Sequence, residues 1–327
     1  MHPKLKTLKI EKLFGHKDIE LHFNDVTVLV GKNGLGKTTL LKILHALLLR
    51  ESGVDIDNCK SAELKFTDNE VIKFDNINTL MGADGNLTYP DLVEFSKKKE
   101  HFYKKMLAIS NDQLGRNKDE VSESLPYFLK IFEQLTLPFE CADSVANFLD
   151  EIVKVNFIST INMSANSQQI LTGSDGRQGN LLDWEIEKEI SDIVKTPIGK
   201  YTLAFIKEVN RHFADSGKKV QIKDGLKVIT PDSKTPLPIS KLSSGERQLL
   251  YIMAKVANTK NSPAFLLMDE PEISLHLNWQ EKLLDSIKTL NPNCQIVVVT
   301  HSPAIIMDGY MDSYIDMENI VVESRNV

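Results

Sequence analysis

The sequence predicts an α/β fold with a mixed, largely parallel sheet, an antiparallel β subdomain at the N-terminus and an inserted helical lobe. Two observations predict the parallel core. Short apolar strands alternate with helical segments towards the C-terminus, and a glycine-rich turn joins the apolar strand 26–30 to an apolar helix, 38–49. Strands that alternate with helices pair in parallel through right-handed crossovers. We therefore expect regions 1–75 and 216–327 to form one core, and 76–215 to be a mostly helical insertion.

Alternating apolar residues predict β-strands throughout the first region. The pattern runs through 5–13, turns at Gly15, and continues through 19–23. It becomes the uninterrupted apolar run 26–30 and returns at 61–74. The short strands on either side of Gly15 are the predicted antiparallel subdomain.

The insertion has a different texture, because Asn, Asp and Gly interrupt its helical stretches. Its first half, 76–150, is expected to be the inserted lobe. The predicted elements are helices at 92–109, 144–155, 182–194 and 201–213, a strand at 157–160 and a polar stretch at 162–180. In the last region, Asp224-Gly225 between two alternating runs predicts a β-hairpin. Its other predicted elements are a helix opening at 243–245, a strand at 265–268, a helix at 279–290, a strand at 296–299 and a short tail.

Composition narrows the class of protein. The 327 residues are 42% hydrophobic and 26% charged, which is ordinary for a soluble globular chain. A net charge of −6 argues against a nucleic-acid footprint over the whole surface, although a local basic patch stays possible. No apolar run of membrane length and no signal peptide is found, so we expect a cytoplasmic protein. Three sparse cysteines indicate reduced thiols and no metal site: Cys59, Cys141 and Cys294.

The glycine-rich turn reads GKNGLGKT from Gly31 to Thr38 and matches G-x-x-x-x-G-K-[ST]. It follows an apolar strand and opens a helix, which is the context that this phosphate-binding loop requires. Glycines let backbone N–H groups turn towards phosphates, and the helix N-terminus adds positive potential. Lys37 would reach the β- and γ-phosphates of ATP, and Thr38 would hold Mg²⁺. The expected nucleotide ligands are Gly31, Asn33, Gly34, Gly36, Lys37, Thr38 and Thr39.

A second motif, FLLMDEP, places two carboxylates at the exit of the apolar strand 265–268. Asp269 is the predicted Mg²⁺ ligand, and Glu270 is placed to polarise the attacking water. A helix cap is the alternative interpretation of this pair. The phosphate-binding loop elsewhere in the chain favours the catalytic one.

Two further motifs are weaker on their own. LSSGERQ, at 242–248, offers a hydroxyl, a glycine N–H and a helix N-terminus to an anion, but Ser243 with Glu246 also fits an ordinary capping box. VVVTHS, at 297–302, ends a strand with His301, and such a histidine is usually structural.

The order of these four motifs resembles that of ABC-type ATPases, with LSSGE as the signature. The resemblance implies that Ser243, Ser244, Gly245 and Glu246 contact ATP bound at Lys37 of another copy. ATP would then bridge two subunits, and its hydrolysis would weaken their interface. The resemblance also makes His301 a γ-phosphate sensor and Ser274 a contact across the interface. Gln168 and Gln169 are candidates by position for the Q-loop residue.

Within that superfamily, the opening LKTLKIEKLFGHKDIELHF and the block ending LPISKLSSGERQLL resemble stand-alone ATPases of the SMC and RecF-like kind. The group around the OLD ATPases, with those of Septu, PARIS and retron defence systems, is the nearest. OLD proteins carry a Toprim nuclease, but only 26 residues follow His301. We therefore expect a separate effector protein, and a solvated acidic end instead of a metal site: Asp308, Asp312, Asp316 and Glu318.

Two functions follow from the resemblance. One is a nucleotide switch that dimerises, or assembles further, around ATP and controls an effector in antiphage defence. The alternative is a DNA repair or maintenance ATPase. The segment FSKKKEHFYKKMLAI, at 95–109, would serve the alternative, because its lysines (among them 97–99) and aromatic residues could contact phosphates and bases. A solvated helix face explains the same segment. A subunit of a membrane transporter is a third, weaker option.

Overall fold

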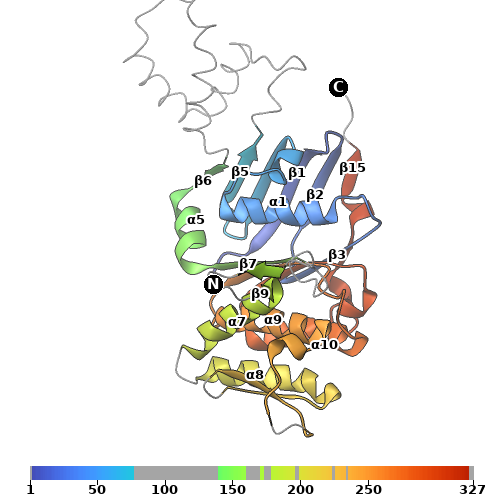
Figure 1. Cartoon of the computed structure of the whole chain (residues 1–327). Coiled ribbons are helices and arrows are strands. Elements are labelled where there is room, and N and C mark those ends of the chain that lie inside the picture. Colours follow the sequence, from blue (N-terminus) through green and yellow to red (C-terminus); the bar gives the residue numbers. More distant parts are fainter. Residues whose placement is uncertain are drawn as a thin grey trace, which may run out of the picture.

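Figure 1 shows the computed structural model of the chain. The structure describes residues 2–76, 139–159, 170–172, 178–195, 199–222, 225–232 and 235–323. The basic segment 95–109, most of the expected lobe 76–150, and the candidates Gln168 and Gln169 lie outside these residues, and so does Asp224 of the predicted hairpin turn. Within the described residues, no helix has both the length and the apolar character needed to cross a membrane.

A five-stranded parallel sheet forms the centre of the molecule, as the sequence predicts. Its strands, in spatial order, are β14 (Tyr314–Asp316), β3 (Val26–Val30), β13 (Cys294–Val299), β12 (Ala264–Asp269) and β7 (Lys154–Ser159). All neighbouring pairs are parallel. Because β3 from the N-terminal region lies between two strands from the C-terminal region, the two ends of the chain build one core.

A second, six-stranded sheet is the predicted antiparallel subdomain. Its order is β15 (Val321–Glu323), β2 (Lys17–His22), β1 (Leu5–Leu13), β4 (Ser61–Phe66), β5 (Val71–Asp75) and β6 (Phe139–Cys141). The tail after His301, for which the sequence suggested no strand, therefore adds one edge strand to each sheet.

Helix α1 (Lys37–Leu49) lies between the two sheets (Figure 1). Its fully buried residues, among them Leu40 and Leu44, share one apolar cluster with Leu8 of the antiparallel sheet and with Phe265 and Val297 of the parallel sheet. Burial of this kind contributes about 25 cal/mol per Å² of apolar surface. The loop that precedes α1 is therefore anchored in a core on both sides.

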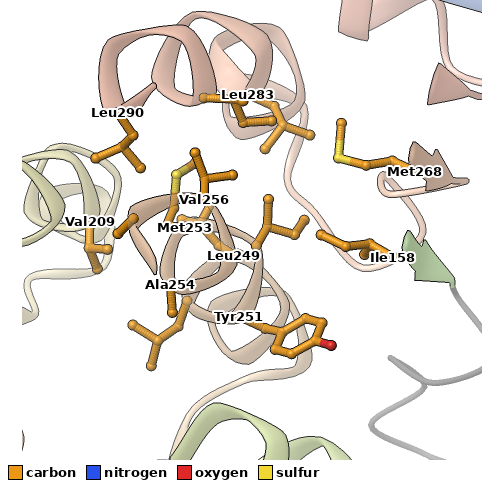
Figure 2. Packing of buried hydrophobic residues seen from close by; sticks show 14 of the residues in the cluster. Ile158, Val209, Leu249, Tyr251, Met253, Ala254, Val256, Met268, Leu283 and Leu290 are labelled. Atoms are coloured by element: carbon orange, nitrogen blue, oxygen red, sulfur yellow. The ribbon is translucent and has the colours of Figure 1, made fainter. Parts of the chain in front are cut away.

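Three helices lie on the opposite face of the parallel sheet: α7 (Leu181–Val194), α9 (Ser244–Asn258) and α10 (Leu277–Leu290). Helix α8 (Lys200–Phe213) packs against α9 and α10 on the side away from the sheet (Figure 1). Leu249 and Met253 of α9 pack between these helices and the strand residue Met268 (Figure 2). Alternate residues of the strands serve the two faces, since Phe265 points to α1 and Leu266 to α9. Helices α1 and α9 therefore lie on opposite sides of one sheet.

The short elements complete the described chain. The predicted hairpin forms from β10 (Lys219–Ile222) and β11 (Leu226–Ile229), and a second small hairpin forms from β8 (Ile170–Thr172) and β9 (Gln178–Asn180). The other short helices are α5 (Asp143–Asn147), the π-helical turn η4 (Phe148–Ile152), and the 3-10 turns η1 (Ile56–Asn58), η5 (Ala214–Ser216), η6 (Ile239–Lys241), η7 (Pro303–Ile306), η8 (Met311–Ser313) and η9 (Met317–Asn319).

One predicted boundary is wrong. The sequence suggested a helix over 144–155, but the helical segment ends at Ile152 and Val153 is extended. The residues that follow form β7, whose Val155 and Ile158 lie opposite Phe265 and Met268. Pairing with a buried strand favours β-branched residues, and here it outweighs local helical propensity.

Candidate nucleotide-binding site

Three loops meet at one edge of the parallel sheet, because parallel strands present their carboxyl ends together. The loop after β3 runs into α1, the loop after β12 begins at Glu270, and the loop after β13 carries Thr300 and His301. Strands β3, β13 and β12 are neighbours in that order. The motifs predicted from three distant parts of the sequence therefore lie side by side.

The glycine-rich loop has the backbone that its sequence suggests. Gly31 and Gly36 have φ angles of 145° and 91°, and a Cβ on Gly31 would lie 3.0 Å from Met317. A residue with a side chain would be strained at both positions. Asn33 and Gly34 are exposed in the middle of the loop, and Thr39 is half-buried in the first turn of α1.

The side chain of Lys37 is buried under this loop. Its Nζ donates hydrogen bonds to the backbone oxygens of Gly31, at 2.7 Å, and Lys32, at 3.1 Å. Burial lowers its pKa, and the carboxylates of Asp269 and Glu270 oppose that shift. A cation that is held only by carbonyl oxygens is well placed to pair with an anion in the loop.

Thr38 and Asp269 come from elements 231 positions apart in sequence and meet in a hydrogen bond. The Thr38 hydroxyl donates to Oδ1 of Asp269 at 3.0 Å. Burial raises the pKa of Asp269, and the bond from Thr38 opposes the rise. The described residues hold no cluster of three or more His, Cys, Asp or Glu that could bind a metal alone. One carboxylate with one hydroxyl suits Mg²⁺, which takes its other ligands from phosphates and water.

Glu270 is held in an unusual backbone conformation. Its φ angle is 49°, in the left-handed region, and its N–H donates to the Val299 oxygen at 2.8 Å. This conformation costs free energy in a residue with a side chain, and such strain clusters at functional sites. Oε1 of Glu270 lies 3.6 Å from Nε2 of His301. The structure thus brings together the two groups that the sequence marked on separate strands.

The LSSGE turn forms the capping box that was its alternative interpretation. Ser243 caps α9 by accepting the N–H of Glu246 at 3.2 Å, and Glu246 accepts the N–H of Ser243 at 2.8 Å. Glu246 is buried and pairs with Lys218 at 2.7 Å. Burial by itself raises the pKa of Glu246, but the bonds from Lys218 and Ser243 bring it below its ordinary value. Ser244 is half-buried in the first turn, and Ser243 is exposed.

Gly245 and Ser274 are in close backbone contact. A Cβ on Gly245 would lie 2.3 Å from the backbone oxygen of Ser274, which only glycine avoids. The tip of α9 is therefore pressed against the loop that follows Glu270. Beside this tip lies a cavity of about 430 Å³ with Ser243, Glu246, Asp215, His276 and Trp279 among its lining residues.

The signature turn and the phosphate-binding loop do not share a face of the sheet. Lys37 opens α1 on the side of the antiparallel sheet, whereas Gly245 belongs to α9 on the side of the helices. In the described part of the chain, the hydrogen bonds of Ser243 stay within its own turn. Within one copy of the chain, the LSSGE turn therefore lies on the other side of the parallel sheet from Lys37.

The acidic tail is closer to the site than sequence reasoning suggested. Asp308, Asp312 and Glu318 are exposed, as expected, but Asp316 ends β14 beside Val30. Glu318 forms an ion pair with Lys32 at 2.9 Å. Sequence reasoning missed the roles of Lys218, Glu272 and Gln280, whose side chains bond to residues of these motifs or to the loops that carry them. Among them, Glu272 lies in the stretch 272–276, which the resemblance places at the D-loop together with Ser274.

Comparisons with known proteins find distant relatives of this chain. The chain is 22% identical to "Retron Vc95 probable ATPase" of Vibrio cholerae serotype O1 biovar El Tor, over 86% of this chain and 66% of that protein. It is 23% identical to "Septu protein PtuA" of Bacillus thuringiensis, over 95% and 75% of the two chains. The chain thus spans two thirds to three quarters of the length of these relatives. These matches confirm the predicted resemblance to the group with Septu and retron ATPases.

Solved SMC heads are also similar. One, bound to the C-winged helix domain of ScpA, has a TM-score of 0.48 at 16% identity and covers 98% of this chain and 97% of its own. Family models match residues 4–153, described as "AAA ATPase domain", and residues 138–308, described as "AAA domain, putative AbiEii toxin, Type IV TA system". Because the second model covers just over half of the chain, this protein belongs to that family of AAA domains.

Proposed function

We propose that this protein binds ATP with Mg²⁺ at the loop 31–38 and hydrolyses it in a site that a second copy completes. Lys37 and the loop N–H groups would hold the β- and γ-phosphates, and Thr38 with Asp269 would hold the metal ion. When bound, Mg²⁺ supplies positive charge against the phosphate oxygens. The hydrogen bond between Thr38 and Asp269 supports this assignment, because it already joins the two proposed ligands.

Glu270 would orient the attacking water and accept its proton. Its strained backbone aims the carboxylate from the end of β12, next to the buried carboxylate of Asp269. His301, 3.6 Å away, would contact the γ-phosphate and help to keep Glu270 in place. General-base catalysis by a positioned carboxylate contributes about 10²–10⁴-fold to a rate.

The placement of α1 and α9 on opposite faces of the parallel sheet is the observation that supports a composite site. Ser243 is exposed at the tip of α9, where it and the helix N-terminus would offer a binding turn to an anion. A second copy, turned head to tail, would bring its Ser243 and Gly245 to the nucleotide held at Lys37. Ser274, already against Gly245, would then lie in the interface.

The particle mass of Glu270→Gln with and without ATP tests this proposal. The substitution keeps the size of the side chain but removes the base, so ATP should be bound without being consumed. We expect a stable dimer, or a larger assembly, that forms with ATP and dissociates when ATP is removed. An unchanged mass at saturating ATP, with binding confirmed by titration, contradicts the composite site.

We further propose that the ATP-driven assembly is a switch that controls a separate effector in bacterial antiphage defence. The similarity to a retron ATPase and to a Septu protein supports this role. Phage challenge of cells that carry the gene with its neighbours tests it. Protection should be lost with Lys37→Met, which cannot hold nucleotide, and kept with Lys32→Met. Equal protection from both variants contradicts a nucleotide switch.

The DNA-binding alternative receives no support from the exposed face of the antiparallel sheet. Lysines on the exposed face of the antiparallel sheet have acidic neighbours, as in the pair of Lys9 with Glu20 at 3.2 Å and that of Lys73 with Glu63 at 3.6 Å. A balanced face of this kind provides no basic track for phosphates. The alternative therefore depends on the segment 95–109, where charge reversal at 97–99 tests it in a gel-shift titration.

A further inference from the structure

Two side chains to which the sequence motifs give no role connect the loops after β12 and β13 by hydrogen bonds. Oε1 of Glu272 accepts the backbone N–H of His301 at 2.8 Å. Gln280, on α10, donates to the oxygens of Leu275, at 2.8 Å, and Glu272, at 3.3 Å. The amide oxygen of Gln280 accepts the Ser302 hydroxyl at 2.6 Å. One loop carries Glu270 and the other carries His301, so these bonds fix the two proposed catalytic groups relative to each other.

Glu272 is poorly explained as a stabilising residue. Its side chain is buried, with 8% of the residue exposed, and its second oxygen, Oε2, has no hydrogen-bond partner among the described residues. A buried oxygen without a partner costs about 1–3 kcal/mol, and more when it is charged. An apolar side chain of similar size would avoid that cost. A carboxylate at this position is therefore best explained by the hydrogen bond that it accepts from the N–H of His301.

We propose that Glu272 is a positioning residue. By accepting the backbone N–H of His301 at the start of the loop after β13, it fixes His301 relative to Glu270. The inference rests on the proposed hydrolytic site, because it assigns His301 its role there. Glu272 acts through His301 and not on the nucleotide. We call the bond from the His301 N–H to Glu272 the clamp. Ser274 lies on the same loop as Glu272 and is in close contact with Gly245 at the tip of α9, so a movement of that tip would also reach His301 through the clamp.

Two substitutions at this position separate positioning from packing. Glu272→Gln keeps the size and an oxygen that accepts the His301 N–H, while Glu272→Met keeps the volume but has no such acceptor. Hydrogen exchange of the His301 amide, measured without nucleotide, should be faster in Glu272→Met and close to wild type in Glu272→Gln. Glu187→Gln, an exposed carboxylate on α7, is the matched control and should change nothing. Unchanged exchange in Glu272→Met overturns the clamp.

Steady-state ATPase kinetics test whether the bond between Glu272 and the His301 N–H contributes to hydrolysis. Glu272→Met should lower kcat about tenfold with little change in KM, as expected for the loss of one buried hydrogen bond. Glu272→Gln should restore most of the rate. On a His301→Ala background, Glu272→Met should cause no further loss, because its effect passes through His301. A full additional loss in the double variant overturns the proposal. If the wild-type chain hydrolyses no ATP, the proposed function fails, whereas the exchange measurement still decides whether the clamp exists.

Discussion

The two faces of the parallel sheet carry the two halves of the proposed site in different ways. On the face of α1, the functional groups lie inside the protein: Lys37 and Asp269 are buried and hydrogen-bonded between two sheets. On the face of α9, Ser243 is exposed at the helix tip, beside a cavity. Under the proposed function, the first half would bind a nucleotide by itself, whereas the second would present its helix tip to the nucleotide of another copy.

The supports of the two halves differ as well. The α1 half is held mainly by apolar packing, with Leu40 and Leu44 fully buried. The α9 half adds an ion pair between Lys218 and the buried Glu246, and the backbone of its Gly245 lies close to that of Ser274. The comparison indicates that the apolar core of the chain holds the proposed cradle in place, whereas the tip of α9 rests on this ion pair and on the loop after β12.

The largest effect is expected at the cradle. Lys37→Met removes the buried cation that donates to the carbonyl oxygens of Gly31 and Lys32. ATP affinity should fall about a thousandfold, in the range for loss of one member of a buried charge pair. Isothermal titration measures this. Lys32→Met is the matched control, because that lysine is exposed and pairs with Glu318. Equal affinity for both variants would show that the loop does not bind phosphate.

A smaller effect is expected on the α9 side of the parallel sheet, where one buried histidine should lower the free energy of unfolding in acid. His212 of α8 is buried beside Trp279 and bonds Ser286 at 2.9 Å. Burial lowers its pKa from 6.5 to about 4. The unfolded chain binds the proton first as pH falls, so stability should decrease between pH 6.5 and 4, by about 3 kcal/mol for this group.

Urea unfolding at a series of pH values checks this expectation. His212→Gln removes the titrating imidazole, so the unfolding free energy should decrease less between pH 6.5 and 4. The exposed control His22→Gln should leave that decrease unchanged. If His212→Gln follows the wild-type curve, the histidine is not kept neutral by the fold.

The smallest expected effect tests whether the tip of α9 takes part in assembly. Gly245→Ala places a methyl group 2.3 Å from the Ser274 oxygen, so the helix tip or the loop must move. Overpacking of this kind costs about 1–3 kcal/mol. ATP binding at Lys37 should persist while ATP-dependent assembly weakens. Gly53→Ala, with no atom within 4 Å of the added carbon, is the control. Normal assembly of Gly245→Ala would argue against the signature as an interface.

The sequence was enough to predict the parts of the site that lie on regular elements. The loop 31–38, the pair Asp269 and Glu270, and His301 each follow an apolar strand, and parallel pairing places such strand ends together. The fold class followed from the same alternation, and the structure confirms the parallel core and the antiparallel subdomain.

Other features could not be predicted, since they depend on contacts between distant residues. No motif predicted the roles of Glu272 and Gln280, which depend on the packing of α10 beside the loops after β12 and β13. The tail was expected to be a solvated end, but its strands pair with β3 and β2. A three-residue strand has too little pattern to be recognised, and its partner in the sheet decides its structure.

Mixing two inactive variants tests the central claim most directly. Lys37→Met lacks the cradle, and Ser243→Asp keeps the helix cap but turns a negative charge towards the phosphates. Each variant alone should be inactive. An equimolar mixture should recover about a quarter of the wild-type ATPase rate, because half of the dimers are mixed and each of these has one intact site. No recovery, with mixed dimers confirmed by mass, would contradict a site shared between two copies.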